Sequence, residues 1–464
     1  MVQISLRSST ALALALTTVL GCAGMTTATA AGSRSTSHSA SPAFPASSAP
    51  SDRSVVAGLT RYAHPLRTTA PVGPAADLDA FAAMTRGANF VGLGEVSHGS
   101  KDVFTVKERV LRQLVEREGF SAFAMEINWS AAARLNTYLT TGRGDLRQIM
   151  REEFQHAYGL TNTEEYLHLF TWIREHNRAG GRQVRLVGMD FADVNPQQYE
   201  RILGWTGEHA PGLLPELQRR YAALRALPGG VATRLETYTG LPLAERKKMA
   251  DDAGAAYRLL EQHATTDPWV LQDARVVSQM ATSFAFDSDD PAQATAANRH
   301  RDRTLAENAV WWQRRTGDRL VVSGHDGHVA YDSAVPAVFP VTMGADLREL
   351  VGREYVAVGT TVDSGDYRAR TANGESGVFS VAPAAPGSNE YTLDQVPHRD
   401  FYIDLRAARR APAVGAWLNT ARPTYVIPGR HPNDPTPPLA LGRAFDIVIH
   451  LHTVRASVLL PPTK

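Results

Sequence analysis

The chain has 464 residues, of which 43% are hydrophobic and 20% are charged, and its formal net charge is +1 at pH 7. A chain of this length can bury a large core, as one elaborated domain or as two, and its composition is typical of a soluble enzyme. Residues 1–21 carry a single charge, that of Arg7, so the remainder has a net charge of about zero with acidic and basic residues interspersed, which argues against a nucleic-acid-binding surface.

The first 30 residues have the pattern of an export signal. Arg7 supplies a weak positive region, an apolar run follows over residues 11–21, and small residues occupy Ala28-Thr-Ala30. This order is typical of a secretory signal, and the apolar run is too short to span a bilayer. We therefore expect residues 1–30 to be a signal peptide and the mature protein to be extracellular.

Cys22 is the only cysteine of the chain and closes the segment Val19-Leu-Gly-Cys22, which resembles a bacterial lipobox. Two outcomes stay open: a lipoprotein anchored to the cell membrane through a lipidated Cys22, or a secreted protein cut near Ala30. In both cases the mature chain has no disulfide bond. Residues 31–55 are rich in Ser, Ala and Pro, and we expect them to form a disordered tether.

From Val56 onward, strand-like and helix-like segments alternate. Residues 103–118 carry apolar side chains at helical spacing and lie between two β-prone runs, which predicts a βαβ unit with parallel strands. Strand patterns resume near Arg319, at residues 355–361 and at residues 445–454. We therefore expect an α/β fold in which residues 56–195 and 291–464 form a mainly parallel sheet flanked by helices.

Residues 196–290 break this alternation. They contain helix-like stretches at 213–227, 243–263 and 269–286, each preceded by or beginning near a proline. We predict that they form an inserted helical subdomain, which covers the carboxyl edge of the sheet and selects the substrate.

Four of the β-prone runs end in ionisable residues. They are Glu95 and His98 after residues 88–93, Glu126 after residues 120–125, Asp190 after residues 184–189, and His325 and His328 after residues 320–323. In an open parallel sheet, ligands bind in the crevice at the carboxyl ends of the strands, so side chains from distant segments converge there. The pattern predicts a hydrolytic site.

Ester hydrolysis needs a base that deprotonates water near neutral pH, and imidazole suits that task. We predict that His98 is this base and that Glu95 or Glu126 orients its ring. His325, His328 and Lys107 are candidates to polarise the carbonyl or stabilise the oxyanion. The Gly-x-Ser-x-Gly pattern of serine hydrolases does not occur at any of these strand ends, so no nucleophilic serine is required.

Four further residues are candidates for substrate binding, and each has a structural alternative. Lys107 could instead lie on a solvated helix face, Asp190 could cap its strand, and Arg301 could form a surface ion pair with Asp302. Trp129 follows Glu126 and could form an apolar wall, whereas most tryptophans of this chain are expected in the core.

Six motifs in order carry a resemblance to the erythromycin esterase family. They are Gly92-Leu-Gly-Glu-Val-Ser-His-Gly-Ser100, Val106-Lys-Glu-Arg-Val-Leu-Arg112, Ala124-Met-Glu126, Leu186-Val-Gly-Met-Asp190, Gly324-His-Asp-Gly-His-Val329 and Thr342-Met-Gly-Ala-Asp-Leu347. Each is short, but six in the right order rarely coincide by chance. The match runs from about Asn89 to Ile449 and includes Phe445-Asp446.

The resemblance implies an α/β core with a helical insertion, and a metal-independent hydrolase that opens macrolide lactone esters without a cofactor. The general-base histidine of the family matches His98, the acidic partners match Glu95 and Glu126, and the late histidine pair matches His325 and His328. Some members have arginine where this chain has Lys107, and lysine does not supply the planar fork of arginine. A small-molecule ester or lactone is the partner that this resemblance implies.

Two other functions stay open from the sequence. In a metal-dependent hydrolase, His98, Glu126 and His325 or His328 would bind zinc, although no closely spaced ligand motif is present. A haem- or ligand-binding lipoprotein of the same superfamily would also carry a Gly-Glu-x-x-His start. Metal analysis distinguishes the first alternative, and an absorbance scan near the haem band distinguishes the second.

Overall fold

The protein is described from a computed structural model, which covers residues 52–263, 266–431 and 436–461. The predicted signal peptide with Cys22, and the tether up to residue 51, lie outside the described residues. The end of the predicted tether needs a correction, because α1 (Asp52–Tyr62) begins at Asp52 and buries Val55 and Leu59 in the core. The two apolar side chains are one helical turn apart, and this gives α1 a face to pack.

A sheet of nine strands, mostly parallel, forms the centre of the described protein, in the order β1-β8-β11-β6-β2-β5-β3-β4 with β7 beside β6. The parallel strands are β2 (Phe90–Leu93), β3 (Ala122–Asn128), β4 (Arg185–Asp190), β5 (Leu320–Ser323), β6 (Tyr355–Arg370) and β11 (Ile447–Val454). Three antiparallel strands, β1 (Ala63–Pro65), β7 (Ser376–Val381) and β8 (Asp400–Asp404), extend it. The predicted α/β fold is confirmed.

Helices cover both faces of this sheet. In β3, Ala122 and Ala124 pack into one hydrophobic cluster while Phe123 and Met125 pack into another, because successive side chains of a strand point to opposite faces. The second cluster contains buried residues of α3 (Lys101–Glu118), α4 (Trp129–Thr141) and α6 (Glu164–Arg178). The first contains α12 (Pro291–Thr316) and α14 (Met343–Val351). Two-sided burial explains the near-continuous apolar character of the central strands.

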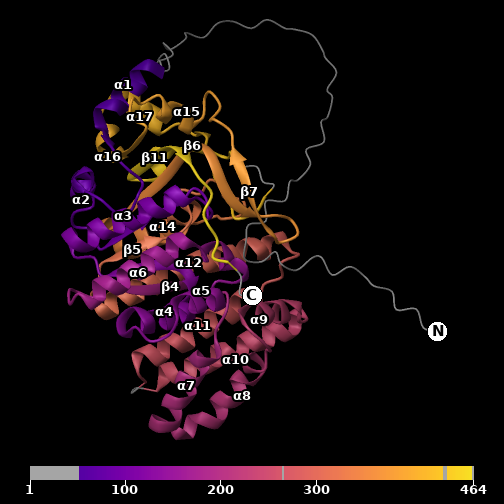
Figure 1. The fold of residues 1–464 in the computed structure, drawn as a ribbon. Helices are drawn as coiled ribbons and strands as arrows, with labels where there is room; N and C mark the ends of the chain where they lie inside the picture. The colour runs from indigo at the N-terminus through magenta and orange to yellow at the C-terminus, as the bar shows by residue number, and fades with distance from the viewer. Residues whose placement is uncertain (1–51, 264–265, 432–435, 462–464) are drawn as a thin grey trace, which may run out of the picture.

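Residues 196–284 are helical almost throughout. They form α7 (Pro196–His209), η3 (Pro211–Leu213), α8 (Leu214–Arg225), α9 (Val231–Gly240), α10 (Leu243–Gln262) and α11 (Pro268–Phe284). Figure 1 shows α7, α8 and α10 together at one end of the molecule, and α1, α15 and α17 at the opposite end. The chain returns to the sheet through α12, which packs against β4 and α14.

The remaining elements are short. They are η1 (Ala76–Leu78), α2 (Asp79–Met84), α5 (Leu146–Glu153), η2 (His156–Thr161), α13 (Asp326–Val329), η4 (Gly352–Glu354), α15 (Asn389–Asp394), α16 (Leu405–Ala408), α17 (Pro412–Leu418), β9 (Arg422–Pro423), β10 (Pro438–Leu439) and α18 (Leu441–Ala444). Among the described residues, no helix combines the length and the apolar character that crossing a lipid bilayer requires.

Candidate active site

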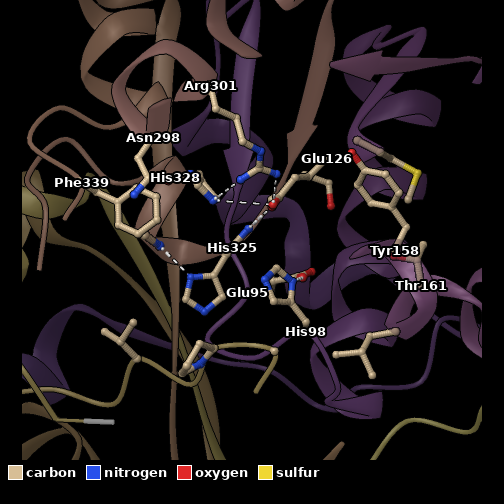
Figure 2. Close-up of a pocket in the computed structure, with 18 of the residues that line it drawn as sticks. Glu95, His98, Glu126, Tyr158, Thr161, Asn298, Arg301, His325, His328 and Phe339 are labelled. Atoms are coloured by element: carbon tan, nitrogen blue, oxygen red, sulfur yellow. Dashed lines mark hydrogen bonds and ion pairs between the residues drawn. The ribbon is translucent and has the colours of Figure 1, made fainter. Parts of the chain in front are cut away.

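A pocket opens at the carboxyl ends of β2, β3 and β5 (Figure 2). Its empty volume is about 1380 Å³ when the solvent at its mouth is included. The acidic and basic side chains in its wall are Glu95, His98, Glu126, Arg301, His325, His328 and Arg370. The expectation that strand-terminal residues converge at this edge of the sheet therefore agrees with the structure.

Glu95 is held in the loop that follows β2. Its Oε2 lies 2.6 Å from Nζ of Lys107 on α3, and both side chains are almost fully buried. Burial alone would raise the pKa of Glu95, but the Lys107 ammonium and His98 outweigh it and lower that pKa to about 2. Gly94 lets this loop pack closely against Asp326, because a Cβ at position 94 would lie 1.8 Å from Oδ1 of Asp326. Glu95 is therefore a fixed carboxylate.

His98 is oriented by that carboxylate. Its Nδ1 lies 2.7 Å from Oε1 of Glu95, and the side chain is 30% exposed, within the pocket wall. An ionised carboxylate accepts only, so Nδ1 carries the proton and Nε2 keeps its lone pair. No described residue forms a hydrogen bond with Nε2. Of the two carboxylates predicted to orient His98, Glu95 is the one that contacts its ring.

Glu126 ends the regular part of β3 and meets Arg301 from α12 (Figure 2). Arg301 Nη2 donates to Glu126 Oε1 at 2.7 Å and also to Asp190 at the end of β4, while Nε lies 3.1 Å from Asp190 Oδ2. Burial opposes ionisation of Glu126, but His328, Arg301 and His98 hold its pKa well below the usual range. One guanidinium thus joins two strand ends.

His328 lies on the other side of Arg301. Its Nδ1 is 2.7 Å from Oδ1 of Asp302, and its Nε2 is 3.2 Å from Arg301 Nη1 and 3.6 Å from Glu126 Oε1. Burial lowers the pKa of His328, but Asp302 and Glu126 outweigh it and raise that pKa. The neutral ring accepts from Arg301, and the protonated ring faces Glu126, so His328 is placed to hold a proton at the pocket wall.

His325 has both ring nitrogens engaged. Nδ1 accepts from the backbone N–H of Gly327 at 3.1 Å, which leaves the proton on Nε2, 3.2 Å from the carbonyl oxygen of Ile427. Burial, with His98 and His328 nearby, lowers the pKa of His325 to about 3. The ring therefore stays neutral and packs beside His98 at a centroid distance of 4.9 Å. His325 therefore holds the loop after β5 in place. It could polarise a substrate carbonyl, as predicted, only if these hydrogen bonds broke.

Three of the predicted substrate contacts need correction. Lys107 and Asp190 do not line the pocket; they are buried and hold Glu95 and Arg301, respectively. Trp129 faces the core, where Nε1 donates to Asp273 at 2.9 Å and the ring packs against Trp311 and Trp312. Of the four candidates, Arg301 alone reaches the pocket.

The walls of the pocket come from α12 and from two loop segments, one of them in the proline-rich stretch 422–438, whose irregular sequence indicates a rim loop. No described residue of 196–290 lines it, so the predicted helices do not form its wall, and α12 contributes through Asn298 and Arg301. The loop after α13 supplies Val335 and Phe339, and the proline-rich segment before β10 supplies several residues: Val426, Pro428, Gly429 and Pro437. Loops over a rigid scaffold commonly shape a binding site.

Sequence reasoning missed several polar residues of the site. Tyr158 and Tyr166 line the pocket from η2 and α6, and burial together with nearby carboxylates keeps the pKa of both phenols well above the usual range. Asp326 lies under Gly94, and burial raises its pKa to about 8. Asp302 is fully buried within α12. Both aspartates had a signal: Asp302 directly follows Arg301 and was paired with it in the sequence, and Asp326 lies within Gly324-His-Asp-Gly-His-Val329.

A family model described as erythromycin esterase matches residues 115–454 of this chain. The erythromycin esterase type II of Escherichia coli is 29% identical over 311 residues, a match that covers 59% of this chain and 69% of that protein. A solved Bacillus cereus protein is 29% identical with a TM-score of 0.79, over 89% of this chain and 100% of that one. A solved protein described as a succinoglycan biosynthesis protein is 26% identical with a TM-score of 0.78, and the match covers 88% of this chain and 99% of that one.

Proposed function

Since this chain belongs to the erythromycin esterase family, we propose that it is a hydrolase that opens a carboxylic ester or lactone with water activated by His98. One observation carries the proposal. The buried carboxylate of Glu95 accepts the Nδ1 proton of His98 at 2.7 Å, so that the basic Nε2 is directed to the pocket. Lys107 keeps Glu95 ionised, which stabilises the imidazolium that forms when His98 takes a proton from water.

The attack proceeds in two balanced steps. Nε2 of His98 takes one proton from water as the oxygen bonds to the acyl carbon, and the carbonyl oxygen becomes an oxyanion. Arg301, with His328 beside it, faces the pocket and stabilises this charge. The tetrahedral intermediate then expels the alkoxide, which takes the proton from the His98 imidazolium, and a carboxylic acid and an alcohol remain.

The substrate proposed for the first test is a macrolide of the erythromycin type. The curated relative is an erythromycin esterase, and the pocket is open to solvent and lined by both apolar and ionisable side chains. Simple lactones and aryl esters belong in the same screen, because the site chemistry acts on the acyl carbon alone.

We also propose that the protein is exported, as the sequence of residues 1–30 indicates, and that Cys22 anchors it to the membrane. Both proposals concern residues outside the described part of the chain.

The test is hydrolysis in water enriched in oxygen-18, followed by mass spectrometry of both products. The proposal expects one label in the carboxylate and none in the alcohol, since the oxygen of water bonds to the acyl carbon and the acyl–oxygen bond breaks; an acyl-enzyme would give the same labels, so a serine variant is needed as well. Ser323 lines the pocket, so Ser323→Ala is the matched control for a serine nucleophile. Loss of turnover in Ser323→Ala together with a trapped acyl-enzyme would contradict the proposal, as would label in the alcohol.

A further inference from the structure

A second group of ligand-type side chains lies away from the pocket, where α15 packs against β6 and β11. Asp363 of β6, His452 of β11 and Asp394 of α15 bring one ligand atom each within 4.8 Å of the others. In the part of the chain that the structure describes, this is the one such group with three or more His, Cys, Asp or Glu side chains. None of the three residues lines the pocket.

The sheet register builds this group. β6 and β11 run parallel, with Leu451 beside Val362 and Thr453 beside Ser364, so His452 stands beside Asp363 on the same face. α15 brings Asp394 onto that face, where its Oδ1 lies 2.7 Å from Nδ1 of His452. Three separate elements thus deliver the three side chains to one place.

The charge of the group is not balanced by a basic side chain. No lysine or arginine in the described residues forms an ion pair with Asp363 or Asp394. Among the described residues, Asp394 pairs with His450 and His452, at 3.4 Å and 2.7 Å, and Asp363 Oδ1 accepts from the backbone N–H of Ala384 at 3.1 Å. Two carboxylates held beside imidazoles, without Lys or Arg, form a local negative potential that favours a cation.

Glu390 supplies a second, independent indication. It lies one helical turn before Asp394 on α15 and is fully buried. Oε1 accepts from the backbone N–H of Tyr425 at 2.9 Å, while Oε2 is buried with no hydrogen-bond partner among the described residues. Burial, with a smaller contribution from the charge of Asp363, raises the pKa of Glu390 to about 7. A buried carboxylate oxygen without a partner is costly, and a nearby cation offsets that cost.

We propose that Asp363, Asp394 and His452 bind one divalent transition-metal ion, such as Zn²⁺ or Mn²⁺. An imidazole nitrogen among the ligands disfavours Ca²⁺ and Mg²⁺, which prefer oxygen alone. The His452 and Asp394 side chains are 36% and 21% exposed, which leaves a coordination position open to water. His450 would orient the ligand Asp394 without binding the ion itself, since its Nδ1 lies 3.0 Å from Thr361 Oγ1 and its Nε2 faces Asp394.

The ion would tie α15 to the two neighbouring strands. Its role is structural, because the ligands lie outside the pocket that holds His98 and Glu126. Metal removal should therefore loosen α15 and lower the melting temperature while the turnover of any hydrolysed ester stays the same.

The test is calorimetric titration of the full chain with ZnCl₂, and then with MnCl₂, after dialysis against chelator. We expect one equivalent to bind and the melting temperature to rise. Asp363→Asn and His452→Gln each remove one ligand with little change in volume, and we expect them to weaken binding at least about a hundredfold, beyond the loss typical of outer partners. Co²⁺ in place of Zn²⁺ should give a ligand-field absorption that Asp363→Asn abolishes.

The matched control is His98→Ala, which removes a ligand-type side chain from the pocket and should leave the binding unchanged. Absence of saturable binding by the wild-type chain overturns the proposal. So does binding that Asp363→Asn and His452→Gln leave intact, or binding that His98→Ala abolishes. Circular dichroism of each variant separates a lost site from a lost fold, and the wild-type titration decides even if a variant does not fold.

Discussion

Replacement of Glu95 by glutamine should separate the structural and catalytic consequences of one buried charge. The pKa of Glu95 is lowered from 4.5 to about 2 by Lys107 and His98, against the cost of burial. That difference corresponds to about 3 kcal/mol of stability at neutral pH, since one pKa unit is about 1.4 kcal/mol. The lowered pKa means that the stabilisation is complete above about pH 4.5 and is lost as the pH falls towards 2.

Glu95→Gln should therefore lower the free energy of unfolding by about 3 kcal/mol at pH 7, because Lys107 stays buried without its carboxylate. The difference from wild type should shrink as the pH falls from 4.5 to 2. Urea unfolding at several pH values measures both effects. In the double variant Glu95→Gln, Lys107→Met, no buried cation is left unpaired, and stability at pH 7 should return to within about 1 kcal/mol of wild type.

Activity, unlike stability, should not recover in the double variant. Both variants lack the carboxylate that stabilises the His98 imidazolium, so kcat on a hydrolysed ester should fall at least about a hundredfold in each. The reasoning is refuted if the double variant is as unstable as the single one, or if either variant keeps the wild-type kcat.

Three further predictions test other parts of the account. Arg301→Lys cannot span Glu126, Asp190 and His328, so kcat should fall about a hundredfold or more; an unchanged kcat contradicts its oxyanion role. Trp129→Phe loses the hydrogen bond to Asp273, so thermal melting should show a free energy of unfolding lower by about 1 kcal/mol, with KM unchanged. A raised KM would instead indicate that Trp129 contacts the substrate. Cys22→Ser should move the protein from the membrane fraction to the medium; wild-type protein found wholly in the medium, starting near Ala31, contradicts anchoring.

The sequence predicted the parts of this structure that depend on local pattern. Apolar runs that end in Glu, Asp or His identify β2, β3, β4 and β5, and the carboxyl ends of parallel strands must share one edge, which brings Glu95, Glu126 and Asp190 together. The periodicity over residues 103–118 similarly gives α3 (Lys101–Glu118). These inferences need no knowledge of how distant loops fold.

The remainder depends on tertiary contacts that a pattern does not encode. Trp129 begins α4, and its direction is set by packing against Trp311 and Trp312, which lie far along the chain. The neutrality of His325 follows from the backbone groups of Gly327 and Ile427 around its ring. Two of the antiparallel strands escaped notice for different reasons. β1 (Ala63–Pro65) is very short, whereas burial alternates along β7 (Ser376–Val381) but Val378 lies on its exposed side, so the sequence does not alternate in the same way.

Chelator experiments must be interpreted with the proposed ion site in mind. Removal of an ion from Asp363, Asp394 and His452 would lower stability and imitate a metal-dependent enzyme if activity were measured only after heating or long dialysis. Turnover measured at once at 25 °C separates the two cases. A metal-free attack by water predicts the same kcat with and without chelator.

Chemical rescue of His98→Ala tests the central claim most directly. The His98 side chain is partly exposed at the pocket, so its removal leaves space that imidazole from solution can reach. We expect kcat for a hydrolysed ester to fall at least about a hundredfold and to recover in proportion to added imidazole, with the neutral form as the active species. Equal rates for wild type and His98→Ala, or activity restored by Zn²⁺ and not by imidazole, would contradict a general base at this position.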